Sequence, residues 1–163
     1  MADYPKRILI VEDNKVDVRL LKDILEGRGY ETLQTGDALE AINLALANLP
    51  DLILMDIQLP DISGLEVTRR LRGDERSRGI PIVAVTAFAM GWHEREVLDS
   101  GCDAYISKPI SILRFLRTVE SFLPPESCCR EGLRQQGVFT SHNFSLGRDR
   151  VARTPHLRVV HSA

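Results

Sequence analysis

The chain has 163 residues, of which 44% are hydrophobic and 27% are charged, and its formal net charge is −2. These values are ordinary for a globular protein, and the length allows one domain with a substantial core. The apolar stretches are too short to cross a membrane, and the N-terminus lacks the basic and then apolar pattern of a secretory signal. Three cysteines without ligand-like spacing argue against a disulfide framework or a zinc site. We therefore expect a cytoplasmic protein that binds no membrane.

Charge is distributed unevenly along the chain. Residues 1–123 carry 15 Lys and Arg against 20 Asp and Glu, whereas residues 124–163 carry 6 Arg against 3 acidic residues. Pro124 and Pro125 end a helical pattern, and no sustained periodicity follows them. We predict one domain at 1–123, then a disordered basic tail at 124–163 with no output domain. Six scattered arginines do not form a clustered basic patch, so we expect no nucleic-acid binding.

Within residues 1–123, strand patterns alternate with helical patterns. The expected strands lie at 6–11, 30–34, 51–56, 81–85 and 103–106, and the expected helices lie at 14–27, 37–48, 64–72, 88–99 and 110–123. Five such repeats with short connections predict an α/β fold, a doubly wound five-stranded parallel sheet with helices on both faces. As a fold-level inference, the strand order is 2-1-3-4-5, which places the first and third strands side by side.

Apolar stripes indicate which faces of two helices are buried. In the first expected helix the stripe recurs at a spacing of four, as Val16, Leu20 and Ile24, flanked by Leu21 and Leu25. In the last one it is formed by Ile112, Leu116, Val119 and Leu123. Phe115 and Phe122 lie beside this second stripe, and we expect them to form a binding patch, with burial in a wide core as the alternative.

Reactive side chains follow the apolar runs where the expected strands end. Glu12 and Asp13 follow the first run, and Asp56 ends the third run just before a proline-containing loop. Thr86 follows the fourth run, and Lys108 follows the fifth. In open parallel sheets the site lies beyond the carboxyl ends of the strands, at the point where the strand order reverses. The three carboxylates should therefore lie close together.

A cluster of carboxylates requires positive charge. Two carboxylates about 4 Å apart repel by roughly 4 kcal/mol at an effective dielectric of about 20. Lys108 supplies one positive charge, and Mg²⁺ supplies two and binds carboxylates together with a substrate phosphate. A carboxylate such as that of Asp56 also attacks phosphorus to form an acyl phosphate. Lys108 and Thr86 would then bind the oxygens of the transferred phosphoryl group.

This constellation resembles the receiver domain of two-component response regulators, over residues 6–123. The similarity is carried by the stretches 11–14, 51–60, 85–90 and 104–110. It implies a flavodoxin-like receiver fold in which Asp56 is the phosphoacceptor, Lys108 and Thr86 are catalytic, and Thr86 and Tyr105 are switch residues. It further implies a cis peptide bond between Lys108 and Pro109. The implied cofactor is Mg²⁺, with these ligands: Glu12, Asp13, Asp56 and the backbone carbonyl of Gln58.

The resemblance also implies a function. A stand-alone receiver takes a phosphoryl group from a histidine kinase or a histidine phosphotransfer protein, and catalyses only its own phosphorylation and dephosphorylation. It then signals through altered protein binding, for which we expect the surface of the fourth helix, fifth strand and fifth helix. One alternative is a phosphate sink within a phosphorelay. Another is an aspartate-nucleophile phosphatase, which fits poorly because Gln58 stands where those enzymes need a second aspartate.

Several features leave simpler interpretations open. Thr86 alone would be read as a helix cap, and Tyr105 as a half-buried strand aromatic. Gly91 and Trp92 interrupt the pattern of the fourth helix. The sequence does not identify the kinase, the target, the phosphate lifetime, the oligomeric state or the role of the tail.

Overall fold

The computed structural model describes residues 4–87 and 91–124. Each predicted strand and helix is present, with ends within three residues of those expected. In chain order the elements are β1 (Arg7–Val11), α1 (Lys15–Glu26), β2 (Glu31–Thr35), α2 (Ala38–Asn48), β3 (Leu52–Asp56), α3 (Gly64–Gly73), β4 (Ile82–Thr86), α4 (Gly91–Asp99), β5 (Ala104–Ser107) and α5 (Ile112–Phe122). Residues 88–90 of the predicted fourth helix, and residues 125–163 of the predicted tail, lie outside the described residues.

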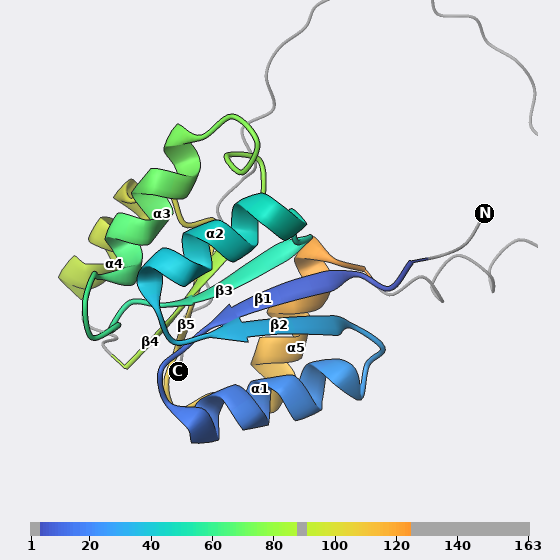
Figure 1. The fold of residues 1–163 in the computed structure, drawn as a ribbon. Helices are drawn as coiled ribbons and strands as arrows, with labels where there is room; N and C mark the ends of the chain where they lie inside the picture. Colours follow the sequence, from blue (N-terminus) through green and yellow to red (C-terminus); the bar gives the residue numbers. More distant parts are fainter. Residues whose placement is uncertain (1–3, 88–90, 125–163) are drawn as a thin grey trace, which may run out of the picture.

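The five strands form one parallel sheet in the order β2-β1-β3-β4-β5 (Figure 1). The predicted α/β fold and strand order are therefore confirmed. The order reverses between β1 and β3, because the chain leaves β1 toward β2 on one side and later adds β3 on the other. In such sheets this reversal leaves room at the carboxyl ends of the two strands.

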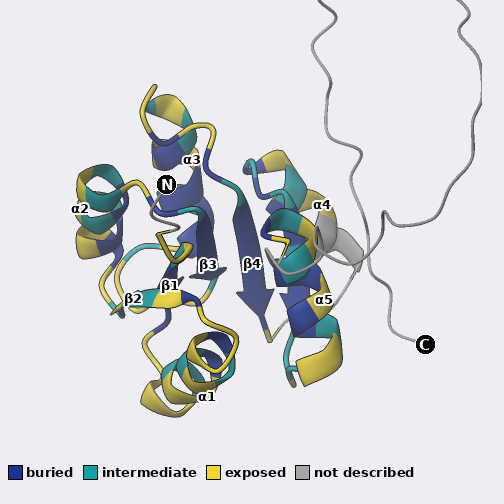
Figure 2. Ribbon diagram, turned by 90° about the vertical axis from the view of Figure 1, so that its right-hand side faces the viewer, coloured by how far each residue is buried: buried dark blue, intermediate teal, exposed yellow. Residues whose placement is uncertain are grey.

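Helices cover both faces of the sheet, and side chains of the inner strands alternate between two apolar cores. Leu9, Ile53 and Ile82 pack with α2, α3 and α4, whereas Ile8 and Leu54 pack with α1 and α5. Every residue of β3 and of β4 is buried, as expected for strands covered on both faces (Figure 2). None of the described helices combines the length and the apolar character that a membrane crossing requires.

The apolar stripes expected on two helices are partly wrong. In α5, Phe115 is fully buried, so it belongs to the core and not to a binding patch, whereas Ile112 is 49% exposed. In α1, Leu21 and Leu25 are buried, whereas Val16 is 75% exposed. In a helix, residues three positions apart and residues four positions apart both lie on the same side. Apolar residues at a spacing of four therefore do not show which of two adjacent helix faces is buried. Packing against the sheet decides between those faces.

The start of α3 is pressed against the end of β3. The Gly64 N–H donates to the carbonyl of Ile57 at 3.0 Å, and the Ser63 hydroxyl caps the helix by accepting from the Leu65 N–H at 3.3 Å. A Cβ atom added at Gly64 would lie 2.0 Å from the carbonyl oxygen of Asp56. Only glycine permits this approach. The loop after Asp56 is therefore held between the strand and the helix.

Candidate functional site

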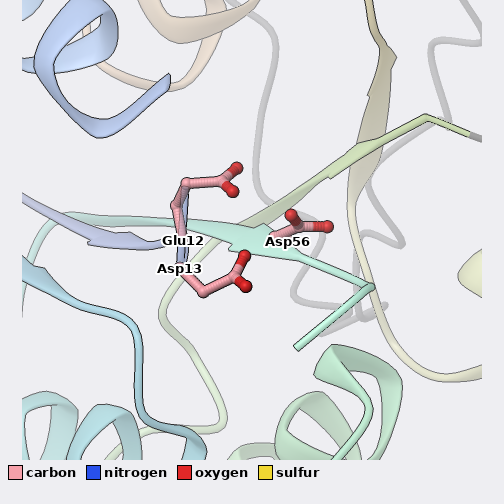
Figure 3. A group of neighbouring side chains, drawn as sticks. All are labelled: Glu12, Asp13 and Asp56. Atoms are coloured by element: carbon pink, nitrogen blue, oxygen red, sulfur yellow. The ribbon is translucent and has the colours of Figure 1, made fainter. Parts of the chain in front are cut away.

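Three carboxylates meet where β1 and β3 end. Val11 pairs with Met55 in the sheet, so Glu12 and Asp13 follow β1 directly beside Asp56. Oxygen atoms of Glu12, Asp13 and Asp56 all lie within 4.8 Å of one another (Figure 3). Glu12 and Asp56 are 3% and 5% exposed, whereas Asp13 is exposed. The structure therefore brings the predicted acidic residues together and leaves one side of the group open to solvent.

The ammonium group of Lys108 reaches this cluster from the loop after β5. Its Nζ lies 2.7 Å from Glu12 Oε2, 2.9 Å from Asp17 Oδ2 and 3.2 Å from Asp56 Oδ2. An ammonium group has three N–H donors, and here three carboxylate oxygens accept them. Lys108 thus joins the residue that follows β1, the first turn of α1 and the end of β3 through one charge.

Asp17 is a residue of this site that the sequence patterns did not predict. It lies in the first turn of α1, where an acidic residue is favoured by the helix dipole whatever its neighbours. That position gives no indication of a contact with Lys108, which is 91 residues away in the chain. A contact of this kind is found only once the strand order and the start of α1 are known.

Backbone N–H groups of the loops orient the two buried carboxylates. Asp56 Oδ1 accepts from the Gln58 N–H at 2.8 Å, while its Oδ2 faces Lys108. Glu12 Oε1 accepts from the Asn14 N–H at 3.2 Å, while its Oε2 faces Lys108. Each carboxylate is therefore fixed by a loop on one side and by the lysine on the other. The role predicted for the Gln58 carbonyl, as a metal ligand, stays a prediction.

The cluster holds more negative charge than Lys108 offsets. Burial raises the pKa of the Glu12 carboxyl to about 7; the hydrogen bond from Lys108 lowers the pKa, and the charge of Asp56 raises it further. Burial alone would lower the pKa of Lys108, but hydrogen bonds to Glu12 and Asp17 raise it above its usual value. The lysine is therefore charged at neutral pH. A group of oxygen ligands that keeps a net negative charge beside a charged lysine suits a hard divalent cation.

Thr86 and Tyr105 lie on the neighbouring strands β4 and β5. Thr86 ends β4, is 2% exposed, and its carbonyl oxygen accepts from the Lys108 N–H at 2.7 Å. Tyr105 is half-buried, stands opposite Ala84, and packs against the core beneath α2, α3 and α4. The Lys108–Pro109 peptide bond is cis, as the resemblance implied.

The match to known proteins decides the family. The family model of the response regulator receiver domain matches residues 8–120. The chain belongs to this family. Receiver domains are regulators in two-component signalling and are not classical enzymes, so the carboxylate cluster and Lys108 lie in a signalling domain.

Similar proteins are found by sequence and by structure. The chain is 55% identical over 119 residues to the polar-differentiation response regulator DivK of Brucella anthropi, covering 73% of this chain and 97% of DivK. The receiver domain of the sensor histidine kinase PA1611 of Pseudomonas aeruginosa PAO1 has a TM-score of 0.69 and 32% identity, over 74% of this chain and 98% of that one. That receiver holds a magnesium ion coordinated in its active site cleft. The phosphorylated cyanobacterial phytochrome response regulator RcpA has a TM-score of 0.64 and 29% identity, over 74% and 96%.

Proposed function

We propose that this receiver accepts a phosphoryl group on Asp56 from a histidine kinase or a histidine phosphotransfer protein. We further propose that the reaction needs Mg²⁺, that the protein acts in the cytoplasm, and that it signals by phosphorylation-dependent protein binding. One observation carries the proposal. The Asp56 carboxylate lies at the tip of β3, 3.2 Å from the Lys108 ammonium, within a group of acidic oxygens no more than 4.8 Å apart.

Each side chain of the cluster has a defined role in this proposal. A carboxylate oxygen of Asp56 is the nucleophile. The Lys108 ammonium and the Thr86 hydroxyl bind oxygens of the transferred phosphoryl group. Glu12, Asp13, Asp56 and the backbone carbonyl of Gln58 would hold Mg²⁺. When bound, Mg²⁺ supplies positive charge that offsets both the carboxylates and the phosphoryl oxygens.

The phosphoryl transfer to Asp56 needs no proton donor or acceptor from the protein. With acetyl phosphate as donor, an Asp56 oxygen forms a bond to phosphorus while the bond from phosphorus to the acetate oxygen breaks. Acetate leaves with the electron pair of that bond and needs no proton. Later a water oxygen forms a bond to phosphorus while the bond from phosphorus to the Asp56 oxygen breaks, so inorganic phosphate leaves and the Asp56 carboxylate is regenerated. In this scheme the chain catalyses only its own phosphorylation and dephosphorylation.

We propose that the surface of α4, β5 and α5 carries the signal. The Thr86 carbonyl at the end of β4 accepts from the N–H of Lys108, which directly follows β5, and Tyr105 lies half-buried on β5. A phosphoryl group that draws the Thr86 hydroxyl toward Asp56 would shift the balance between two positions of Tyr105. Ile112 and Leu113, at the start of α5, are 49% and 71% exposed and give this surface apolar contact area.

Intact-mass measurement tests the proposed function directly. After incubation with Mg²⁺ and acetyl phosphate, we expect the protein to gain the mass of one phosphoryl group and to lose it over time by hydrolysis. The same incubation with excess EDTA should give no gain, because the repulsion among the carboxylates then remains. An unmodified protein in the presence of Mg²⁺ and a fresh phosphodonor would rule out the proposed function.

Mg²⁺ should also stabilise the folded protein in the absence of any phosphodonor. A ligand that binds only the folded state contributes about 2.7 kcal/mol at one hundred times its dissociation constant. We expect thermal melts in millimolar Mg²⁺ to show a higher midpoint than melts in EDTA. The shift should be much smaller in Asp13→Ala, whose exposed side chain can be removed without disturbing the core.

Asp23→Ala is the matched control for the magnesium melts. Asp23 is an exposed acidic residue of α1 that lies near Arg19 and outside the carboxylate group. Its melt should shift with Mg²⁺ as the wild type does. Equal shifts in all three proteins would show that the ion binds elsewhere.

A further inference from the structure

Asp17 contacts Lys108 but has no part in the phosphoryl transfer or the cation binding proposed above. Its Oδ2 atom lies 2.9 Å from the Lys108 ammonium, and its side chain is 27% exposed, compared with 2% for Glu12. Because it lies outside the group of Glu12, Asp13 and Asp56, it is not needed to complete the proposed cation ligands. Its carboxylate adds negative charge to a cluster that already has an excess, so the contact requires another explanation.

We infer that Asp17 is a positioning residue that, together with Glu12, fixes the direction of the Lys108 ammonium. Two of the three N–H donors are occupied by these residues, at 2.9 and 2.7 Å. The third donor then has one direction left, toward Asp56 at 3.2 Å, the longest of the three distances. This inference rests on the proposed function, since it concerns how Lys108 is presented to the phosphoryl group.

Asp17 is well placed to hold the lysine because α1 is fixed on both sides of this residue, by a helix cap before it and by buried side chains after it. Asn14 caps α1 by accepting from the Val16 N–H at 2.9 Å, which fixes the first turn. Leu21 and Leu25 bury the next two turns against the sheet. A side chain on such an element has less freedom than one on a loop, so its carboxylate can define the position of a long, flexible lysine.

The arrangement allows phosphorylation with only one exchange of hydrogen-bond partners. Bond formation between Asp56 and phosphorus reduces the negative charge of the carboxylate and brings phosphoryl oxygens beside it. The third N–H of Lys108 moves from Asp56 Oδ2 to a phosphoryl oxygen, while Glu12 and Asp17 keep the other two. Without Asp17, one more N–H of the ammonium group lacks a fixed acceptor, so the group can take a wider range of positions. Imprecise placement of a catalytic group lowers the rate at saturating substrate more than it weakens binding.

Two variants of Asp17 separate positioning from charge. Asp17→Ala removes both the charge and the hydrogen-bond acceptor, whereas Asp17→Asn removes the same charge but keeps an oxygen that accepts from Lys108. With acetyl phosphate at saturating Mg²⁺, we expect Asp17→Ala to lower the maximal phosphorylation rate constant about tenfold. The rate constant of Asp17→Asn should stay within about threefold of the wild-type value. That of Asp23→Ala, a variant on the same helix, should equal the wild-type value.

The Lys108 ammonium resonance in ¹⁵N NMR spectra provides a readout that does not depend on phosphorylation. In the wild type we expect a slowly exchanging, assignable ammonium signal, which should disappear in Asp17→Ala and persist in Asp17→Asn. An unchanged rate constant and an unchanged signal in Asp17→Ala would overturn the inference. Equal losses in Asp17→Ala and Asp17→Asn would also overturn it, because charge alone would then explain the effect. A wild type that accepts no phosphoryl group, with the signal still dependent on Asp17, would instead overturn the function proposed above.

Discussion

Replacing Asp56 with asparagine should abolish phosphorylation while leaving the fold intact. Asparagine has nearly the same size as aspartate and keeps an oxygen that accepts the Gln58 N–H, so the loop after β3 retains its hydrogen bond. The amide is a very poor nucleophile toward phosphorus, and both oxygens of the neighbouring Glu12 already accept hydrogen bonds, from Lys108 and from the Asn14 N–H. We therefore expect no stable mass gain from acetyl phosphate and Mg²⁺ in Asp56→Asn.

The same pair of proteins tests the proposed signalling surface. In the wild type, phosphorylation should shift amide NMR signals around Asp56 and also over residues 104–116, which include Tyr105 and the start of α5. In Asp56→Asn, acetyl phosphate should shift neither group. Shifts confined to the loops around Asp13 and Asp56 would favour a phosphate sink over a signalling protein. A stable phosphoryl adduct on Asp56→Asn would show that another residue is the phosphoacceptor.

The sequence predicts the fold and the acidic cluster because both follow from short, strong patterns. Buried runs such as residues 52–56 contain no polar alternation, so both their faces must be covered by helices. Parallel strands then bring residues that follow each run to one edge of the sheet. This is why Glu12, Asp13 and Asp56 are found together although the first and last are 44 positions apart. Lys108 joins them for the same reason.

Contacts made by helices are harder to predict, because they depend on how each helix is rotated against the sheet. Phe115 and Ile112 are three positions apart in α5, yet one is fully buried and the other is 49% exposed. The apolar pattern allows either residue to face the core. Asp17 shows the same limit, since its contact with Lys108 depends on the rotation of α1. The regular direction of side chains along strands makes the strand-end residues predictable, and helix rotation leaves Asp17 unpredictable.

Gly64→Ala should be strongly destabilising, because the first residue of α3 has no room for a side chain. The added Cβ would lie 2.0 Å from the Asp56 carbonyl oxygen, 2.9 Å from its carbonyl carbon and 3.0 Å from Met55 Cγ. Two of these atoms belong to the backbone of β3, a fully buried strand, and cannot rotate away. Either α3 or the end of β3 must shift. Forcing atoms into a packed region costs about 3 kcal/mol, a large share of the roughly 5–15 kcal/mol that stabilise a typical domain.

Urea denaturation of Gly64→Ala and Gly73→Ala measures this cost against a control in the same helix. Gly73 ends α3, and a Cβ atom there would meet nothing within 4 Å. Alanine at that position should therefore leave the free energy of unfolding unchanged or raise it by up to about 1 kcal/mol. Because the clash at Gly64 moves the backbone of Asp56, the folded fraction of Gly64→Ala should also be phosphorylated more slowly than Gly73→Ala. Similar stabilities and rates for the two variants would mean that the tight contact between α3 and the end of β3 does not hold the phosphoacceptor in place.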